Sequence, residues 1–535
     1  MVWCFLCNLI YVCGSFYRGI TCMETCDLEV TNWGPVASGR VEFRKMTVFV
    51  GANNTGKSYI AMLFYALVRA FRGAFSTIKE YGLFGVGRFP SVPEGIVEGV
   101  VRGLEPGSEP GKDVLKDLVC SVCEKHYVPL IREVLVKSGP AVRSEIERVF
   151  SSDVGEIISR GSRQAAINFR LNGRIVSVTS SIRIDRSDNL DMDVDVKIDC
   201  EELIRVLWRD RSRVRRAMEA MRRAREYSVR SGDARFRRAI LAGVYELLRR
   251  AFILIMEDVL RALPDVFYLP ASRAGILHSY RTVAKAIISL APLAPIRGAE
   301  IPKIPGPIAD FLGELMEITP EYGAFRRLSE KSSGELGEIS EELERFILEG
   351  EVKLVREAPE APPTLIYRFN GEEVPMARVS SMVAEIAPLD LYLKYGVVKP
   401  GDLIIIEEPE AHLHPDKQAK LAEIFVKLVN RVGIRVVVTT HSEVFLAKLS
   451  NLVSLSGLPR EEVEELGFTM DSVLRAGDVS VYRFVRAGDG AVSIEEVGVT
   501  REGIPDDVFR EIVEDLYEET MDIYYRVQGR GLRGE

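Results

Sequence analysis

The sequence is poor in glutamine and has no excess of positive charge. Only three glutamines occur in 535 residues, at positions 164, 418 and 528. Lysine and arginine number 70 against 78 acidic residues, so the net charge of −8 does not by itself predict nucleic-acid binding. The scarcity of amides and the 28% of charged residues are typical of proteins from hot environments. The chain contains no internal repeat or low-complexity tract, and its length suggests about two to four structural units.

Residues 51–58 fit the phosphate-loop pattern GxxxxGK[ST] at every fixed position: Gly51, Ala52, Asn53, Asn54, Thr55, Gly56, Lys57 and Ser58. The apolar run 46–50 predicts a buried strand before this loop, and 59–67 predict a helix after it. Such a strand, turn and helix start direct backbone N–H groups and a positive helix end at one anion. We expect Lys57 to reach the β- and γ-phosphates of a nucleoside triphosphate and Ser58 to bind Mg²⁺.

Two further predicted strands end in polar residues. Residues 402–406 predict a buried strand that runs into Glu407 and Glu408, and 435–440 predict another that ends at His441. We expect Glu407 to hold Mg²⁺ and Glu408 to orient or deprotonate the attacking water. His441 could contact the γ-phosphate, because ligands of parallel sheets lie at the carboxyl edge. Paired glutamates and a single histidine are also ordinary structural features. Their order and spacing along the chain nevertheless favour the catalytic interpretation.

These segments together resemble ABC-type ATPases of the AAA/OLD-like group, which is related to the RecF and SMC heads. The resemblance rests on 51–58, 404–415 and 439–442, and 28–35 are similar to the first strand of those heads. It implies an α/β fold, namely an ABC-type P-loop NTPase head with a mixed sheet and flanking helices. Because 350 residues separate Lys57 from Glu407, we expect a largely helical insertion to split the head. ATP and Mg²⁺ are the implied cofactors, and ATP hydrolysis is the implied reaction.

Two heads of that family enclose two ATP molecules, and a signature serine of one head contacts the γ-phosphate held by the other. The matching residues in this chain are Ser380 and Ser381. Met382 stands where the family usually has glycine, which is a departure beside the contact between heads. The resemblance nevertheless implies a homodimer formed through ATP.

Residues 267–275 predict a strand that runs into a loop, and similar Y-x-P-A-x-R segments occur in this ATPase group. By position the loop replaces the glutamine loop of transport-type ABC heads, for which no glutamine is available. Arg273 is predicted either to contact phosphate or the interface, or to form a plain surface salt bridge. The missing glutamine loop disfavours a transporter subunit, and no membrane partner is expected.

Between Arg205 and Arg238, thirteen arginines stand against four acidic residues. An arginine-rich helix there could follow the phosphates of double-stranded DNA, or it could be a solvated helix. Two possible metal motifs are interpreted as structural. Asp191, Asp193 and Asp195 alternate along a solvated strand face, and the pair Cys120 and Cys123 lies within one helical pattern.

Five of the eight cysteines lie in the first 26 residues. A secreted disulfide framework is not expected in a large nucleotide-binding chain. Residues 1–17 carry no charge, yet they lack a basic start and are short for a membrane span. We interpret 1–22 as an extension from a misplaced start, with a signal or membrane anchor as the alternative.

The predicted organisation follows the motifs along the chain. Its segments are the extension (1–22), the first head lobe with the phosphate loop (23–80), an insertion with a β-hairpin near 165–198 that could belong to the first lobe (81–263), a strand and loop returning to the head (264–290), a connector with helices (291–350), the second lobe (351–520) and a tail (521–535).

The predicted function is an ATP-hydrolysing ABC-type ATPase that acts as a nucleotide-gated homodimer in the cytoplasm, in DNA repair or in defence against mobile elements. The alternative is a nucleotide-sensing regulatory or binding subunit that works with a separate effector subunit. Only 94 residues follow His441, and they carry no acidic Toprim pattern. The chain is therefore not expected to cut nucleic acid itself.

Overall fold

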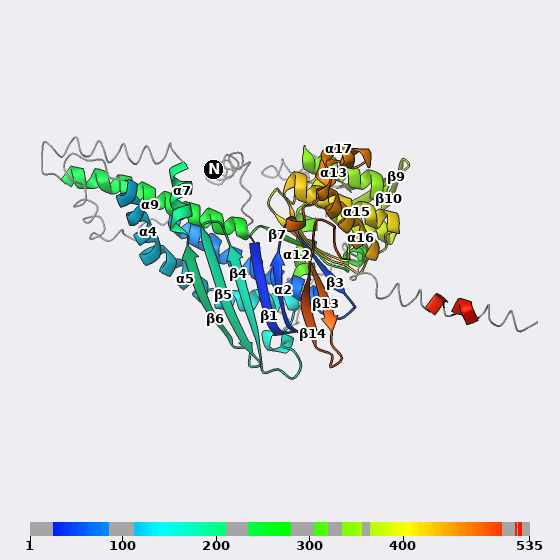
Figure 1. Ribbon diagram of the computed structural model, residues 1–535, viewed down its shortest axis with the longest axis horizontal. Coiled ribbons are helices and arrows are strands. Elements are labelled where there is room, and N and C mark those ends of the chain that lie inside the picture. The colour runs from blue at the N-terminus through cyan, green and yellow to red at the C-terminus, as the bar shows by residue number, and fades with distance from the viewer. Residues whose placement is uncertain are drawn as a thin grey trace, which may run out of the picture.

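The main sheet of the protein has eleven strands in the order β6-β5-β4-β1-β2-β14-β13-β3-β12-β11-β7 (Figure 1). This computed structural model describes residues 25–84, 112–209, 234–279, 304–318, 334–355, 364–505, 519–521 and 523–526. A smaller antiparallel sheet has the order β10-β9-β8. Its strands are β8 (Glu351–Val355), β9 (Thr364–Phe369) and β10 (Glu372–Pro375). The predicted fold class, a mixed sheet with flanking helices, is confirmed.

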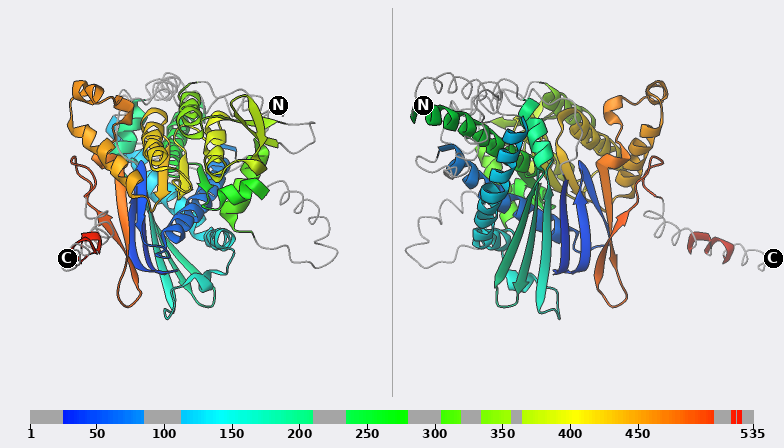
Figure 2. Two further views of the ribbon diagram at one scale, coloured as in Figure 1. Left: turned by 90° about the vertical axis from the view of Figure 1, so that its right-hand side faces the viewer. Right: turned by 60° about the vertical axis from the view of Figure 1, so that its left-hand side comes forward.

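One half of the main sheet is antiparallel. Its strands are β1 (Thr25–Trp33), β2 (Val36–Phe43), β4 (Gln164–Asn172), β5 (Val176–Asp185) and β6 (Leu190–Ile198). In β4, β5 and β6 every second residue is buried, as expected for strands with helices on one face and solvent on the other. Figure 2 (right) shows these blue-to-green strands side by side. Since β4 pairs with β1, the predicted hairpin is part of the main sheet.

Parallel pairing dominates the other half of the sheet. Strands β3, β12, β11 and β7 pair in parallel, and β13 runs parallel to β3. Neighbouring residues of β11 point to opposite faces and are all buried, because helices cover both sides. The bounds are β3 (Met46–Gly51), β7 (Val266–Leu269), β11 (Leu403–Glu407), β12 (Arg435–Thr439), β13 (Val479–Arg486) and β14 (Val492–Val497).

Two groups of helices cover the sheet, and each forms its own hydrophobic core. The first group lies mainly beside β4 to β6 (Figure 1) and consists of α2 (Lys57–Phe84), α4 (Lys112–Val122), the π-helix η1 (Cys123–Tyr127), α5 (Val128–Lys137), α6 (Gly139–Phe150), α7 (Cys200–Arg209) and α9 (Ala234–Ala262). The second group contains α12 (Gly306–Glu317), α13 (Glu335–Leu343), the π-helix η3 (Glu344–Leu348), α14 (Ser381–Lys394), α15 (Pro415–Lys427), the π-helix η5 (Leu428–Val432), α16 (Glu443–Ser454) and α17 (Arg460–Glu465).

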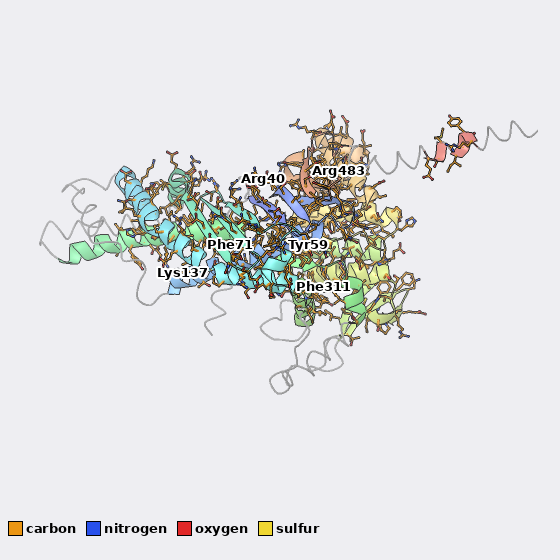
Figure 3. All side chains as sticks on the ribbon, turned by 90° about the horizontal axis from the view of Figure 1, so that it is seen from below. Arg40, Tyr59, Phe71, Lys137, Phe311 and Arg483 are labelled. Atoms are coloured by element: carbon orange, nitrogen blue, oxygen red, sulfur yellow. The ribbon has the colours of Figure 1, made fainter. Side chains whose placement is uncertain are left out.

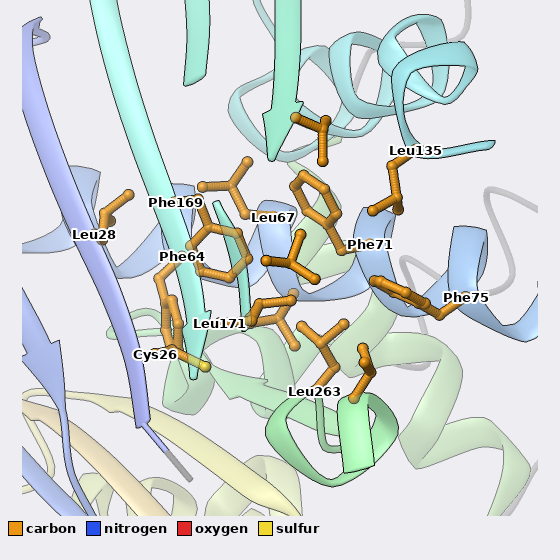
Figure 4. Close-up of a cluster of buried hydrophobic side chains, with 14 of the residues drawn as sticks. Cys26, Leu28, Phe64, Leu67, Phe71, Phe75, Leu135, Phe169, Leu171 and Leu263 are labelled. Atoms are coloured by element: carbon orange, nitrogen blue, oxygen red, sulfur yellow. The ribbon is translucent and has the colours of Figure 1, made fainter. Parts of the chain in front are cut away.

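Helix α2 anchors the phosphate loop to the first core. Its aromatic residues Phe64 and Phe71 pack against Phe169 of β4, with ring centroids 6.3 and 5.4 Å apart. Figure 4 shows these rings between the helix and the strands, together with Leu67. Each buried side chain of this size contributes about 1.5–3 kcal/mol relative to an exposed one. The segment Lys57–Thr77 is long and apolar enough to cross a membrane, but 61% of it is buried in the protein.

One carboxylate of a neighbouring helix binds the turn of the hairpin between β4 and β5. Asp258 of α9 accepts hydrogen bonds from the backbone N–H groups of Arg174, Ile175 and Val176. A Cβ atom on Gly173 would lie 2.3 Å from the Asp258 carboxylate, so the turn requires glycine. The Asn172-Gly173 turn of this hairpin is therefore also a contact with α9.

Helix α12 begins with Gly306 and Pro307 and lies within 291–350, where the sequence predicts a connector with helices. Proline is tolerated in the first turn of a helix because the N–H it lacks would have no helical partner there. Asp191, Asp193 and Asp195 are exposed on β6, as predicted.

Candidate active site

The phosphate loop connects β3 to α2 and depends on two glycines with positive φ. Gly51 has a φ of 134° and Gly56 a φ of 94°. A Cβ atom on Gly51 would lie 2.6 Å from the Phe484 carbonyl oxygen, and one on Gly56 would lie 2.9 Å from Pro35. Any side chain at these positions would therefore push the loop away from β13 or from the β1–β2 turn. The sequence pattern requires glycine here for both conformation and space.

A cleft of about 1200 Å³ opens over the loop. Its floor is the phosphate loop with Lys57 and Ser58, and Glu408, Thr439 and His441 lie at the carboxyl ends of β11 and β12. Tyr59 also lines the cleft. Figure 3 labels Tyr59 near the middle of the molecule. The cleft thus joins motifs from both ends of the chain.

Lys57 is nearly buried at the bottom of this cleft, with 6% of its surface exposed. Its ammonium group donates hydrogen bonds of 2.9 Å to the carbonyl oxygens of Gly51 and Ala52. Burial lowers the pKa of Lys57 to about 8, although the nearby charges of Glu408 and Glu410 act in the opposite direction. A phosphate bound at this position would lie beside the poorly solvated ammonium group of Lys57. Opposite charges attract each other strongly where little water screens them.

The pKa of Lys57 predicts that ATP affinity depends on pH. As the pH rises through about 8, Lys57 loses its proton and no longer neutralises phosphate charge. We expect the Kd of a fluorescent ATP analogue to rise up to about tenfold per pH unit above this pKa. The variant Lys57→Arg stays charged throughout, so its Kd should show little change over the same range. An equal rise in both proteins would contradict the assignment.

Glu407 and Glu408 leave β11 in different directions. Glu407 is buried, and its carboxylate accepts a hydrogen bond of 3.0 Å from the Ala271 backbone N–H. Glu408 lines the cleft with 47% of its side chain exposed. Its φ of 42° is in the left-handed region, which non-glycine residues rarely adopt. Backbone strain of this kind is typical of functional sites.

His441 faces Glu408 across the cleft, with 3.8 Å between its Nε2 and the Glu408 carboxylate. Burial and the positive charge of Lys57 lower the pKa of His441. A lowered pKa favours the neutral imidazole, which donates one N–H. Glu410, which is buried, accepts hydrogen bonds of 2.7 Å from the Thr440 hydroxyl and the His441 backbone N–H. This carboxylate fixes the turn that presents His441.

The predicted magnesium residues have suitable donor chemistry. Ser58 offers a hydroxyl oxygen and Glu407 a carboxylate, and Mg²⁺ prefers such hard oxygen ligands. Among the described residues, no group of three or more His, Cys, Asp and Glu side chains could hold a metal. In nucleotide sites Mg²⁺ is usually bound by one or two protein side chains together with phosphate oxygens and water.

The structure does not bring the signature serines into this cleft. Ser380 and Ser381 are exposed at the start of α14, and neither lines the cleft. The Ser380 hydroxyl caps the helix by accepting a hydrogen bond of 3.4 Å from the Val383 N–H. Met382 packs against the second core, which gives its side chain a structural role.

The surface salt bridge predicted as one alternative for Arg273 is wrong. Its side chain is only 1% exposed, so it forms no surface salt bridge. It makes four hydrogen bonds to the carbonyl oxygens of Glu385, Pro270, Glu407 and Glu408. A guanidinium group has five N–H donors, and here they face backbone and the Glu385 carboxylate. Arg273 is buried beside the turn that carries Glu408 and does not line the cleft.

Sequence reasoning missed the walls of the cleft. One wall comes from the β1–β2 turn and the segment 156–160, including Arg160. Another is the turn of the β13–β14 hairpin, Asp489, Gly490 and Ala491. The Asp-Gly pair signals a hairpin turn, but only the sheet order places it beside a loop more than 400 residues earlier. Of the arginine-rich region, residues 210–233 lie outside the part of the chain that the structure describes.

Comparison with known proteins agrees with this site. Residues 300–446 match the family model of the AAA ATPase domain. The predicted resemblance to P-loop ATPases is confirmed. The match includes Ser380, Glu408 and His441, whereas the phosphate loop lies outside it. Residues 300–446 are thus similar to the AAA ATPase domain, and the phosphate-loop sequence lies ahead of them in the same chain. No curated protein matches it.

Several solved SMC heads are similar to the chain at low identity. An SMC head bound to the C-winged helix domain of ScpA shares 12% identity, with a TM-score of 0.39, and the match covers 90% of this chain and 99% of that one. The head with a coiled coil and joint from Pyrococcus yayanosii has 12% identity and a TM-score of 0.37, with coverages of 90% and 98%. The Thermotoga maritima head has 9% identity and a TM-score of 0.32, with coverages of 89% and 100%.

Proposed function

We propose that this protein hydrolyses ATP to ADP and phosphate as a nucleotide-gated homodimer. The observation that supports hydrolysis is the shared cleft in which Lys57, Glu408 and His441 meet above the phosphate loop. A cation, a half-exposed carboxylate and a neutral imidazole are the groups needed to bind phosphate, handle water and stabilise the transferred phosphoryl group.

The roles of the residues follow from their positions. Water attacks the γ-phosphorus in line, and the bond to the β–γ bridging oxygen breaks as ADP leaves. Glu408 orients this water and accepts its proton, while Lys57 stabilises charge on the phosphate oxygens. His441 donates a hydrogen bond to the γ-phosphate. Mg²⁺, when bound by Ser58 and Glu407, neutralises charge on the β- and γ-phosphates.

Dimerisation is supported by the place of the signature residues. Ser380 and Ser381 are exposed at the N-terminus of α14, outside the cleft of their own copy. A helix start presents free N–H groups and a positive dipole end, which suit a phosphate. A second copy could therefore present this helix start to the γ-phosphate. The side chain of Met382 packs on the core and leaves the serines as the contact.

We further propose a role in DNA repair or in defence against mobile elements, with double-stranded DNA as the ligand. This part rests on the family resemblance and on the arginine-rich sequence between 205 and 238. A separate effector subunit remains the alternative partner, in which case ATP would control assembly.

Light scattering after size exclusion, combined with phosphate release, tests the proposal. We expect Glu408→Gln to form a dimer with ATP and a monomer without it, and DNA to raise turnover by the wild type. Lys57→Ala should remain monomeric under both conditions. Turnover by a protein that stays monomeric with ATP would contradict the homodimer. Slow turnover without an ATP-dependent dimer and without a response to DNA would favour the nucleotide-sensing alternative.

A further inference from the structure

Arg273 lies directly behind the turn that carries Glu408. It follows β7 and the turn 270–272, at the start of the helical segment 273–279, and β7 pairs with β11 in the sheet. Its Nη1 donates a hydrogen bond of 2.5 Å to the Glu407 carbonyl, and its Nη2 donates one of 3.1 Å to the Glu408 carbonyl. One guanidinium group therefore holds two successive carbonyl oxygens of this turn.

The turn needs such support because its backbone is strained. Glu408 adopts a φ of 42°, and the surrounding structure must maintain a conformation of this kind. On the other side, the Glu408 N–H donates a hydrogen bond of 2.8 Å to the Thr439 carbonyl of β12. The backbone of Glu408 is thus held at its N–H by the hydrogen bond to β12 and at its carbonyl by the hydrogen bond from Arg273.

Arg273 also contacts the helix that begins at the signature serines. Its Nε donates a hydrogen bond of 3.0 Å to the Glu385 carbonyl in α14. Its Nη2 lies 2.9 Å from the Glu385 carboxylate, which is buried with 2% exposure. Glu385 is about one helical turn beyond Ser381. The same side chain therefore joins α14 to the Glu408 turn.

We propose that Arg273 is a positioning residue for hydrolysis, which holds Glu408 in its strained conformation and sets that turn against α14. The inference rests on the proposed function, because it assigns Glu408 the handling of water. Arg273 acts through Glu408 and touches neither water nor phosphate. Lysine cannot replace it, because one ammonium group cannot span two carbonyls and Glu385 in a fixed planar arrangement.

A purely structural role is the competing explanation. Arg273 and Glu385 form a buried ion pair, and removing one partner of such a pair destabilises a protein. A structural defect would lower ATP affinity, turnover and thermal stability together, whatever residue occupies position 408. A positioning defect would lower turnover only as long as Glu408 is present.

A double-mutant cycle separates the two explanations. The proteins are wild type, Arg273→Lys, Glu408→Gln and the double variant, compared in kcat, Kd for ATP and Tm. We expect Arg273→Lys to lower kcat at least about thirtyfold and to leave Kd within about threefold. In the Glu408→Gln background, the same substitution should change the residual kcat by less than about threefold. The proposal would be overturned if the kcat losses of the two single variants multiplied in the double variant. It would also be overturned if Arg273→Lys left kcat unchanged.

Two further variants show whether a folding defect explains the loss of turnover. Arg273→Gln combined with Glu385→Gln removes both buried charges, so no charge remains unpaired. We expect this pair to bind ATP and to lose turnover like Arg273→Lys, and retained turnover would overturn the proposal. Arg431→Lys is the matched control, because Arg431 pairs with Glu338 outside the cleft and should keep its kcat. A wild type without turnover would overturn the proposed function itself, and this inference with it.

Discussion

Replacing Glu408 by glutamine should lower ATP turnover by about 10²–10⁴-fold, the usual contribution of a general base. The amide keeps the size of the side chain and removes its ability to take a proton. Glu408 lines the cleft 3.8 Å from His441, and its charge acts on Lys57, so its carboxylate lies beside the space that a terminal phosphate would occupy. ATP affinity should remain within about threefold, because the phosphate loop is unchanged. Phosphate release at saturating ATP and the Kd of a fluorescent analogue measure the two effects separately.

Glu443→Gln is a matched control for this experiment. Glu443 is exposed at the start of α16, two residues beyond His441, and does not line the cleft. The same chemical change there should leave turnover unaltered. Turnover that survives in Glu408→Gln would show that another group handles the water. Loss of turnover in both variants would point to a general electrostatic effect.

Replacing Lys57 by alanine should raise the Kd for ATP at least about 100-fold. A hydrogen bond to a charged group contributes about 1.5–3 kcal/mol, and Lys57 is expected to make such bonds to two phosphates. The folded protein should lose little stability, since the lowered pKa of Lys57 shows that its charge is unfavourable where it is buried. Nucleotide titration and thermal unfolding without nucleotide give the two results.

Lys45→Ala provides the comparison for Lys57→Ala. Lys45 pairs with Asp478 at 3.1 Å just before β3, and it does not line the cleft. Removing this half-exposed ion pair should change stability by less than about 1 kcal/mol and leave ATP affinity unaltered. If Lys57→Ala still bound ATP tightly, the phosphate loop would not be the nucleotide site.

Local patterns explain why so much of the site was predictable. The phosphate loop, Glu408 and His441 each follow a short run of apolar residues, and such runs identify buried strands. Because the strands are parallel, their carboxyl ends lie at the same edge of the sheet. The residues that follow these strand ends therefore lie close together. The prediction required no knowledge of the insertion, residues 81–263.

Arg273 shows where this reasoning fails. An arginine in a loop is exposed in most proteins, and its sequence neighbours give no sign of burial. Its partners Glu385, Glu407 and Glu408 are more than 100 residues away. Only the pairing of β7 with β11 and the packing of α14 bring them together. A buried guanidinium group requires several acceptors at once, and the tertiary structure supplied them.

The sequence by itself determined the strands, the helices, the phosphate loop and the acidic and histidine residues at the strand ends, because these depend on neighbours along the chain. The tertiary structure alone decided that β13 and β14 lie between β2 and β3, that Arg160 and Asp489 line the cleft, and that Arg273 supports Glu408 from behind. Those arrangements depend on pairing and packing between segments far apart in sequence. Such contacts leave no periodic pattern in the chain, since burial and strand order arise only when the whole sheet forms.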